Sequence, residues 1–235
     1  MPATEKVVVI TGGNAGIGFT TALELAKQGA QVCLVCRNAD RGRAAMKAVA
    51  HVASRPPLLF LADLSSQRDV RALATDLHER LRCVDVLINN AGAAFATRTL
   101  TVDGIERTFA TNHLAPFLLT DLVLDLLRKS TQGRVVTLTA GVPVRRAGFL
   151  ANLQGEKGYG QFSAYRTSKV SNILFTYELA RRLDGTRITA NCVHPGPVRT
   201  EFTRKAGGTL LRLSKLLRLI MRSPGGCSRT GLSRR

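Results

Sequence analysis

Apolar runs rich in β-branched residues alternate with amphipathic stretches along most of the chain. Short runs that are apolar on both faces are typical of buried parallel strands, and the stretches between them have helical periodicity. Parallel strands require crossover connections, which are nearly always right-handed. The pattern therefore predicts an α/β fold with one doubly wound parallel sheet of the Rossmann type. Its six expected strands lie within residues 6–12, 31–37, 57–64, 84–92, 133–141 and 187–196.

This alternation continues without a linker or repeat to residue 202, which predicts one domain over residues 1–202. Residues 203–235 hold nine Lys or Arg and no acid, half of the net charge of +18. Within them, residues 210–221 have the pattern of a basic amphipathic helix. We interpret it as a substrate lid, with weak contact to an anionic membrane as the alternative. The last residues lack periodicity and are expected to be disordered, and no seventh strand is evident.

The cysteines and the N-terminus indicate the compartment. The five cysteines lie mostly in apolar stretches, which favours buried thiols in a reducing compartment. Cys33 and Cys36 lie three apart on an expected strand and so face opposite ways, which argues against a metal site. Only six residues precede the first strand, and no apolar run reaches the roughly 20 residues of a membrane span. We expect a cytoplasmic protein without a specific nucleic-acid site, since half of the excess charge lies in the tail and the remaining domain is only mildly basic.

A glycine-rich turn, "TGGNAGIG" at residues 11–18, joins the first strand to the first helix. Glycines at such a turn let the backbone approach a pyrophosphate, and the helix N-terminus offers free N–H groups to its oxygens. The turn therefore predicts a dinucleotide site. Its candidate cofactor contacts are Gly12, Asn14, Gly16, Ile17 and Gly18.

The residue after the second strand indicates which dinucleotide is preferred. An acid at this place would hold the ribose hydroxyls of NAD, but the chain has Arg37 there, with Arg41 and Arg43 nearby. A guanidinium suits a 2′-phosphate, because its planar donors match phosphate oxygens. We therefore expect NADP(H) to be preferred over NAD(H), the alternative for Arg37 being a solvated surface residue.

Six segments together resemble the short-chain dehydrogenase/reductase family, in the family's order and spacing. The run from residue 152 to 183 resembles the retinol-dehydrogenase-like branch of that family. The six segments are "TGGNAGIG" (11–18), "ADL" (62–64), "NNAG" (89–92), "TNHLAPFLLT" (111–120), "YRTSK" (165–169) and "HPGPVRTEF" (194–202).

The resemblance implies a role for each matched residue. Asp63 and Leu64 would flank the adenine of the cofactor. Asn112 would hold a water in a proton relay, the alternative being an asparagine that caps or interrupts a helix. The remaining implied cofactor contacts lie beside the ribose and the nicotinamide: Asn90, Ala91, Gly92, Pro195, Gly196, Val198 and Thr200.

Tyr165 and Lys169 would form the catalytic pair and also contact the cofactor. A free tyrosine has a pKa of about 10 and is a poor proton shuttle near neutral pH. Lys169 lies one helical turn away, so its ammonium is expected to lower the pKa of Tyr165. Tyr165 would then exchange a proton with the substrate oxygen while hydride moves between the nicotinamide and the substrate carbon. We expect His113 and His194 to be packing residues.

The chain departs from the family pattern at the end of the fifth strand. Two serines are usual there, and the second hydrogen-bonds the substrate oxygen, whereas this chain has Thr139 and Ala140. Alanine cannot donate, and loss of one such donor typically costs about 10²–10³ in rate. Thr139 is the first candidate for the missing hydroxyl and Ser163 a more distant one.

The sequence thus predicts an NADP(H)-preferring oxidoreductase that interconverts a carbonyl and an alcohol on an apolar small molecule. The alternative is an NADP(H)-binding protein with little or no catalysis, acting as a sensor or structural protein. Ala140 and the missing seventh strand motivate this alternative. A homodimer is possible, although loss of that strand would leave the sixth as an edge and weaken the usual dimer surface.

Overall fold

The computed structural model describes residues 3–141 and 151–196. These residues form a six-stranded parallel sheet in the order β3-β2-β1-β4-β5-β6, which confirms the expected doubly wound fold and all six strands. The segments assigned to a lid helix and a disordered tail lie outside the described residues. The strands are β1 (Val7–Thr11), β2 (Gln31–Cys36), β3 (Leu58–Leu61), β4 (Val86–Asn89), β5 (Arg134–Leu138) and β6 (Thr189–Val193).

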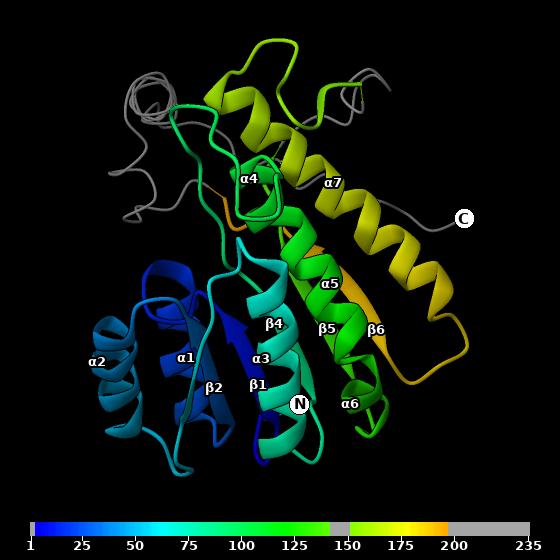
Figure 1. Cartoon of the computed structure of the whole chain (residues 1–235). Helices are drawn as coiled ribbons and strands as arrows, with labels where there is room; N and C mark the ends of the chain where they lie inside the picture. The colour runs from blue at the N-terminus through cyan, green and yellow to red at the C-terminus, as the bar shows by residue number, and fades with distance from the viewer. Residues whose placement is uncertain (1–2, 142–150, 197–235) are drawn as a thin grey trace, which may run out of the picture.

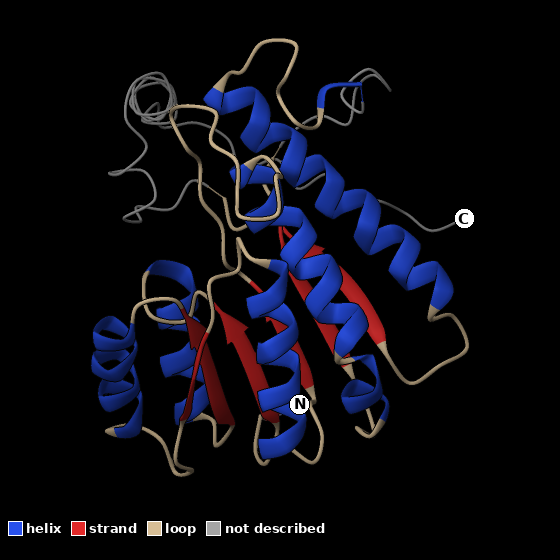
Figure 2. Cartoon of the chain, in the orientation of Figure 1, coloured by secondary structure: helices blue, strands red, loops and turns tan. Residues whose placement is uncertain are grey.

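Helices cover both faces of this sheet (Figures 1 and 2). One face packs on α1 (Gly16–Lys27) and α2 (Ala39–Ala50) through small residues such as Ala22 and Ala45. The other packs on α3 (Gln67–Arg80), α5 (Ala115–Leu122), α6 (Leu124–Arg128) and the end of α7 (Gln161–Arg182). The central strands are buried on both faces, because Val8 and Ile10 point into the first cluster and Val9 into the second. No helix among the described residues is long and apolar enough to cross a membrane.

The two cysteines of β2 point to opposite faces, as expected. Cys33 packs in the cluster under α3 and α5. Cys36 lies toward α2, where a Cβ added to Gly42 would come within 2.6 Å of its Sγ. Both are free and buried, and burial raises the pKa of Cys33 to about 12. Their thiols are therefore packing groups in this fold.

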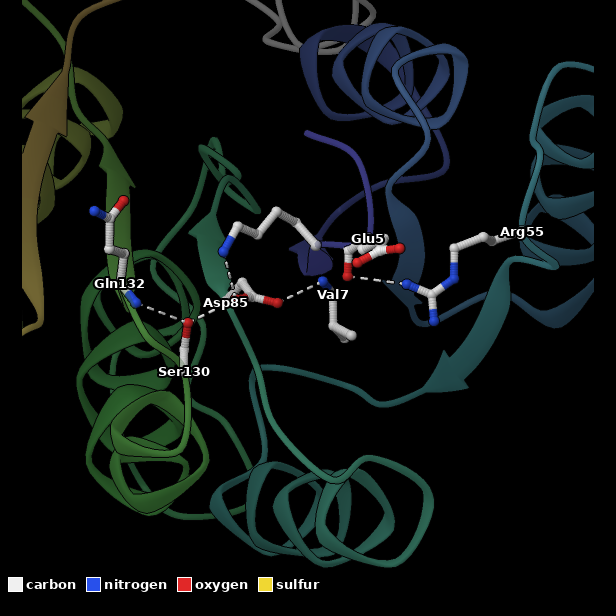
Figure 3. Close-up of polar contacts among 7 residues, drawn as sticks. Glu5, Val7, Arg55, Asp85, Ser130 and Gln132 are labelled. Atoms are coloured by element: carbon white, nitrogen blue, oxygen red, sulfur yellow. Dashed lines mark hydrogen bonds and ion pairs between the residues drawn. The ribbon is translucent and has the colours of Figure 1, made fainter. Parts of the chain in front are cut away.

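The amino ends of three strands meet at Asp85 (Figure 3). Its carboxylate accepts a hydrogen bond from Val7 N at 2.8 Å, from Ser130 Oγ at 2.6 Å and from Lys6 Nζ at 3.1 Å. The backbone carbonyl of Asp85 accepts from Arg134 N at the start of β5. Asp85 thus ties the beginnings of β1, β4 and β5 together, β1 through its carboxylate and β5 through its backbone carbonyl. This edge is opposite the carboxyl ends where such sheets bind ligands.

The segment after β4 forms an interrupted helix rather than a continuous one. The helix begins with α4 (Arg107–Phe109), widens into the π-turn η1 (Ala110–Leu114), continues as α5 and is interrupted at Val123 before α6. Pro116 lies in the first turn of α5, where its missing N–H costs little, and the widening comes before it. The irregular turn is centred on Asn112.

Candidate functional site

The glycine-rich turn has the backbone geometry that a dinucleotide site needs. Gly12 and Gly16 have φ of 66° and 54°, which side chains disfavour. A Cβ on Gly18 would lie 2.6 Å from Gly12 O and would also overlap the amide of Asn90. Asn14 and Ile17 lie half-buried in the turn and at the start of α1. Helix α1 has no side-chain cap and no acid in its first turn, so its N–H groups suit an anion.

Asn90 and Ala91 hold this turn from behind. Asn90 Nδ2 donates to Thr11 O at 2.7 Å, and the backbone N–H groups of Asn90 and Ala91 both donate to Thr11 Oγ1 at 3.0 Å. A Cβ on Gly12 would come 3.0 Å from Ala91 Cα. The end of β4 is thereby fixed against the end of β1. Asn90 supports the turn with its side chain, a role that the motif alone did not reveal.

The adenine end of the expected site contains an ion pair. Arg37 Nη1 lies 3.3 Å from Asp63 Oδ2, and the Arg37 side chain is 62% exposed. Burial acts to raise the pKa of Asp63, but hydrogen bonds from the backbone and hydroxyl of Ser65, together with Arg37, hold it below its usual value. Leu64 packs against the core beside this pair. The sequence-predicted residues after β2 and β3 are therefore brought together.

Tyr165 and Lys169 lie near the start of α7, where it passes the carboxyl ends of β4 and β5. Lys169 is 4% exposed, and its Nζ donates to Leu138 O at 2.9 Å. The same nitrogen would be 3.5 Å from a Cβ on Gly92, so the two residues lie in van der Waals reach of each other. Lys169 Nζ lies 5.8 Å from the centroid of the Tyr165 ring. The expected pair therefore shares one site with Gly92.

The predicted direction of the Tyr165 pKa shift is wrong for this structure. Burial raises the pKa of Tyr165 to about 12, and burial lowers the pKa of Lys169 to about 8. The reason is that both side chains are removed from water, which disfavours the charged form of each. At neutral pH, burial therefore keeps Tyr165 as a neutral phenol.

Asn112 is fully buried at the centre of a hydrogen-bond network. Its Oδ1 accepts from Ala93 N at 2.7 Å, and its Nδ2 donates to Ala93 O at 2.8 Å and to Ser168 Oγ at 3.0 Å. The backbone carbonyl of Asn112 accepts from Asn172 Nδ2 at 2.9 Å. The side chain thus fixes the loop after β4, and the carbonyl joins η1 to α7. Asn112 also lies close to Lys169, since a Cβ on Gly92 would be 3.4 Å from Asn112 Oδ1 and 3.5 Å from Lys169 Nζ.

Ser168 and Asn172 are the residues that sequence reasoning missed. Ser168 Oγ donates to Tyr165 O at 2.7 Å while it accepts from Asn112. Asn172 Oδ1 lies 3.0 Å from His113 Nδ1, and burial lowers the pKa of His113. The available signal was their spacing, since residues three and seven places after Tyr165 share its side of a helix. His113 is the packing residue that was expected.

The hydroxyl of Thr139 is bonded within the protein and does not fit the predicted role of donor to the substrate oxygen. Its Oγ1 donates to Lys169 O at 3.0 Å, and the residue is 7% exposed. A hydroxyl has one proton, so while this bond is made Thr139 cannot donate to a substrate oxygen. Ala140 follows with no donor in its side chain, and Ser163 is exposed. The structure therefore assigns Thr139 to the support of α7.

The nicotinamide end of the expected site is described in part. Pro195 and Gly196 follow β6 at the carboxyl edge of the sheet, and Gly196 has a φ of 73°. Val198 and Thr200, which the resemblance assigned to the same end, lie outside the described residues. The described residues fit a dinucleotide, because the cradle at Gly12 and Gly18 would be filled by any Cβ.

Comparison with known proteins agrees with this arrangement. Residues 6–210 match the family model of the short chain dehydrogenases. Mouse retinol dehydrogenase 11 is 43% identical over 201 residues, which cover 85% of this chain and 63% of that protein. Bovine dehydrogenase/reductase SDR family member 13 is 40% identical over 232 residues, 97% of this chain and 61% of that protein. The chain thus spans less than two thirds of the length of these relatives.

Solved structures show the same fold. A crystal structure of a protein from Mycobacterium paratuberculosis is 38% identical, with a TM-score of 0.70 over 82% of this chain and 69% of the other. The Pseudomonas aeruginosa RhlG/NADP complex is 25% identical, with a TM-score of 0.71 over 92% and 90%. With the match to the family model and the geometry above, the chain belongs to the short-chain dehydrogenase family.

Proposed function

We propose that the protein is an NADP(H)-preferring oxidoreductase that interconverts a carbonyl and an alcohol on an apolar small molecule. The observation that carries this proposal is the convergence of Tyr165, Lys169 and Asn112 at the carboxyl edge of the sheet, beside the glycine-rich turn. The names of the retinol dehydrogenases support an apolar alcohol or aldehyde as the substrate class.

The described residues would hold the dinucleotide along this edge. Its pyrophosphate would face the turn from Gly12 to Gly18, its adenosine end would lie by Asp63 and Leu64, and its nicotinamide end by Gly196. Arg37 would donate to a 2′-phosphate and release Asp63 to do so. The bound cofactor supplies or accepts the hydride. The chain supplies position, exclusion of water and the proton.

Tyr165 is the proton donor in the reductive direction. A phenol held neutral by burial is in the form that can donate to a carbonyl oxygen. Lys169 stabilises the phenolate that remains, because its ammonium is the cation beside the ring. Asn112 holds the loop after β4 and the π-turn in place around them. The high pKa of Tyr165 favours carbonyl reduction at neutral pH and alcohol oxidation at alkaline pH.

The test combines binding with turnover. Titration with NADPH and NADH, followed by nucleotide fluorescence, measures the two affinities. Reduction of all-trans-retinal and of nonanal is then followed by chromatography of the alcohol products. Tyr165→Phe removes the acid, and Tyr177→Phe is the matched control, because Tyr177 is on the same helix and 66% exposed. Turnover lost only in Tyr165→Phe supports the proposal.

A second candidate is an NADP(H)-binding protein with little or no catalysis. It is favoured by Ala140 and by the engagement of the Thr139 hydroxyl with α7. NADPH binding without reduction of any probe, in both the unmodified protein and Tyr177→Phe, would select this candidate. Equal turnover in Tyr165→Phe and the unmodified protein would contradict the proposed mechanism.

A further inference from the structure

At the end of β5 the proposed site lacks a hydrogen-bond donor for the substrate oxygen. The family pattern has a serine there, and this chain has Ala140. Ala140 offers only a methyl group, and the proton of Thr139 is directed to Lys169 O. Negative charge develops on a carbonyl oxygen as hydride reaches its carbon, and one preorganised donor typically contributes about 10²–10³ in rate. The structure contains another donor at the same strand end.

His194 leaves the sheet beside this point. Strands β5 and β6 pair in register as far as Leu138 and Val193, and Thr139 N donates to Val193 O at 2.9 Å. His194 is the next residue, so it emerges beside Thr139 at the carboxyl edge. Lys169 Nζ bonds to Leu138 O at this same strand end. His194 and the Lys169 ammonium therefore both lie at the carboxyl ends of the paired strands β5 and β6.

The imidazole of His194 lies directly against Gly141. A Cβ built on Gly141 would be 2.7 Å from His194 Nε2, 3.2 Å from its Cδ2 and 3.4 Å from its Cε1. The ring thus presents Nε2 first to the backbone that follows Ala140. His194 is exposed and has no hydrogen-bond partner among the described residues. The expectation that His194 is a packing residue is therefore wrong, whereas His113 is half-buried and bonded to Asn172.

We propose that His194 is a further catalytic residue, whose Nε2–H donates a hydrogen bond to the substrate oxygen in place of the missing serine. This inference rests on the proposed oxidoreductase function. Hydride adds to the carbonyl carbon, the C=O π pair moves to the oxygen, and Tyr165 gives that oxygen its proton. His194 keeps its own proton throughout, so a neutral imidazole with hydrogen on Nε2 is sufficient.

A double-mutant cycle tests this role. The four proteins are the unmodified chain, His194→Ala, Ala140→Ser, and both changes together, assayed with NADPH and the probes all-trans-retinal and nonanal. His194→Ala should lower kcat about 10²-fold in the unmodified background and less than about 5-fold in the Ala140→Ser background. NADPH affinity should stay within about 3-fold, which also shows that each variant is folded. His194→Gln should recover about 10-fold of the loss, because an amide N–H can donate.

Two further variants separate donation from packing. Gly141→Ala should displace the ring, since the added Cβ would meet Nε2 and an exposed side chain can swing away. It should lower kcat about 10-fold or more while His194 is still present. His51→Ala is the control, because His51 is also an exposed histidine, at the end of α2. It should leave kcat unchanged.

The outcomes distinguish this inference from the function on which it rests. Unchanged kcat in His194→Ala, or an equal loss with and without the Ala140→Ser change, would overturn the role of His194. An inactive unmodified protein made active by Ala140→Ser would also overturn it while supporting the proposed function. NADPH binding without turnover in any of the four proteins would refute both.

Discussion

Among single side chains, Arg37 is the residue expected to make the protein prefer NADP(H) over NAD(H). Its guanidinium lies 3.3 Å from the Asp63 carboxylate, so it is already directed to the adenosine end of the proposed site. A 2′-phosphate offers this group stronger, bidentate acceptors, whereas NADH has only a hydroxyl there. Arg37 should therefore contribute to the affinity for one cofactor and hardly to the other.

Replacing Arg37 by alanine should raise the Kd of NADPH by about 10- to 100-fold, the equivalent of about 1.5–3 kcal/mol for a hydrogen bond to a charged group. The Kd of NADH should change by less than about 3-fold. Arg181→Ala is the matched control, because its side chain is also largely exposed, at 71%, and paired with an acid, Glu178, near the far end of α7. Equal weakening for both dinucleotides, measured by fluorescence titration, would refute the assignment.

Lys169 is a charge that the fold buries, and among the described residues its Nζ donates to the carbonyl oxygen of Leu138 rather than to an acid. Burial lowers its pKa from 10.5 to about 8, so between these pH values the unfolded chain binds more protons. Stability from this group therefore rises as pH rises through the window from about 8 to 10.5. Tyr165 opposes this only above pH 10, where the unfolded phenol ionises first.

Lys169→Met should raise the free energy of unfolding of the nucleotide-free protein at pH 7 by about 1–3 kcal/mol, because an apolar chain of similar length replaces a desolvated ammonium. The rise of stability between pH 8 and 10 should flatten, and turnover should be lost. Urea unfolding at several pH values measures both effects. A variant that is less stable at pH 7 and keeps the unmodified pH slope would contradict this account.

Among the elements, the π-turn η1 depends on a helix distant in sequence. The carbonyl of Asn112 accepts from Asn172 of α7, whose other amide atom lies 3.0 Å from His113 Nδ1. The side-chain amide of Asn172 thus contacts two residues of the π-turn, Asn112 through its nitrogen and His113 through its oxygen. Since Asn112 also fixes the loop after β4, this amide links three segments around the proposed catalytic pair.

Asn172→Asp tests this link with a nearly isosteric change. A carboxylate can still accept from His113 but cannot donate to Asn112 O, which is then left facing a negative charge. The variant should lose about 1–3 kcal/mol of stability and also lose kcat. Asn191→Asp, the same change at an exposed position of β6, should change neither by a measurable amount. If thermal unfolding shows equal losses at the two positions, the π-turn does not depend on this bond.

Local pattern was sufficient for the strands and insufficient for this turn. The six apolar runs predicted all six strands, because buried parallel strands have a signature within their own residues. Local pattern did not indicate the π-turn around Asn112, whose carbonyl accepts a hydrogen bond from a residue 60 positions away. The motif located Tyr165 and Lys169, whereas the directions of their pKa shifts depend on burial by the whole fold. The same holds for the hydroxyl of Thr139, which is engaged by the helix that packs on it.

At the scale of the whole molecule, hydrogen bonds to one residue join the amino ends of the central strands, and the proposed site lies at their carboxyl ends. Asp85, at the start of β4, joins β1 and the turn before β5 through a carboxylate whose side chain is 10% exposed (Figure 3). Burial acts to raise its pKa, but the hydrogen bonds from Ser130, Val7 and Lys6 hold it below 3.8. A group with a lowered pKa in the folded state stabilises the protein above its unfolded pKa.

Asp85→Asn should therefore lower the free energy of unfolding at pH 7 by about 1–3 kcal/mol, and the difference should shrink as pH falls through the folded pKa of Asp85. Asp76→Asn is the control, because its ion pair with Arg80 is exposed and worth about 0–1 kcal/mol. The measurement is urea unfolding from pH 7 to pH 3. A difference that stays constant to pH 3 would exclude the ionised carboxylate as the stabilising group.

The central claim is that this chain transfers hydride between NADP(H) and an apolar carbonyl with Tyr165 as the acid. The most direct measurement is isotope transfer from NADPH carrying deuterium at C4, prepared separately on each face of the ring. The account predicts one deuterium in the alcohol formed from retinal or nonanal, from one face only, and none with Tyr165→Phe. Bound NADPH with no deuterium in any alcohol, or the same label transfer by Tyr165→Phe, would contradict it.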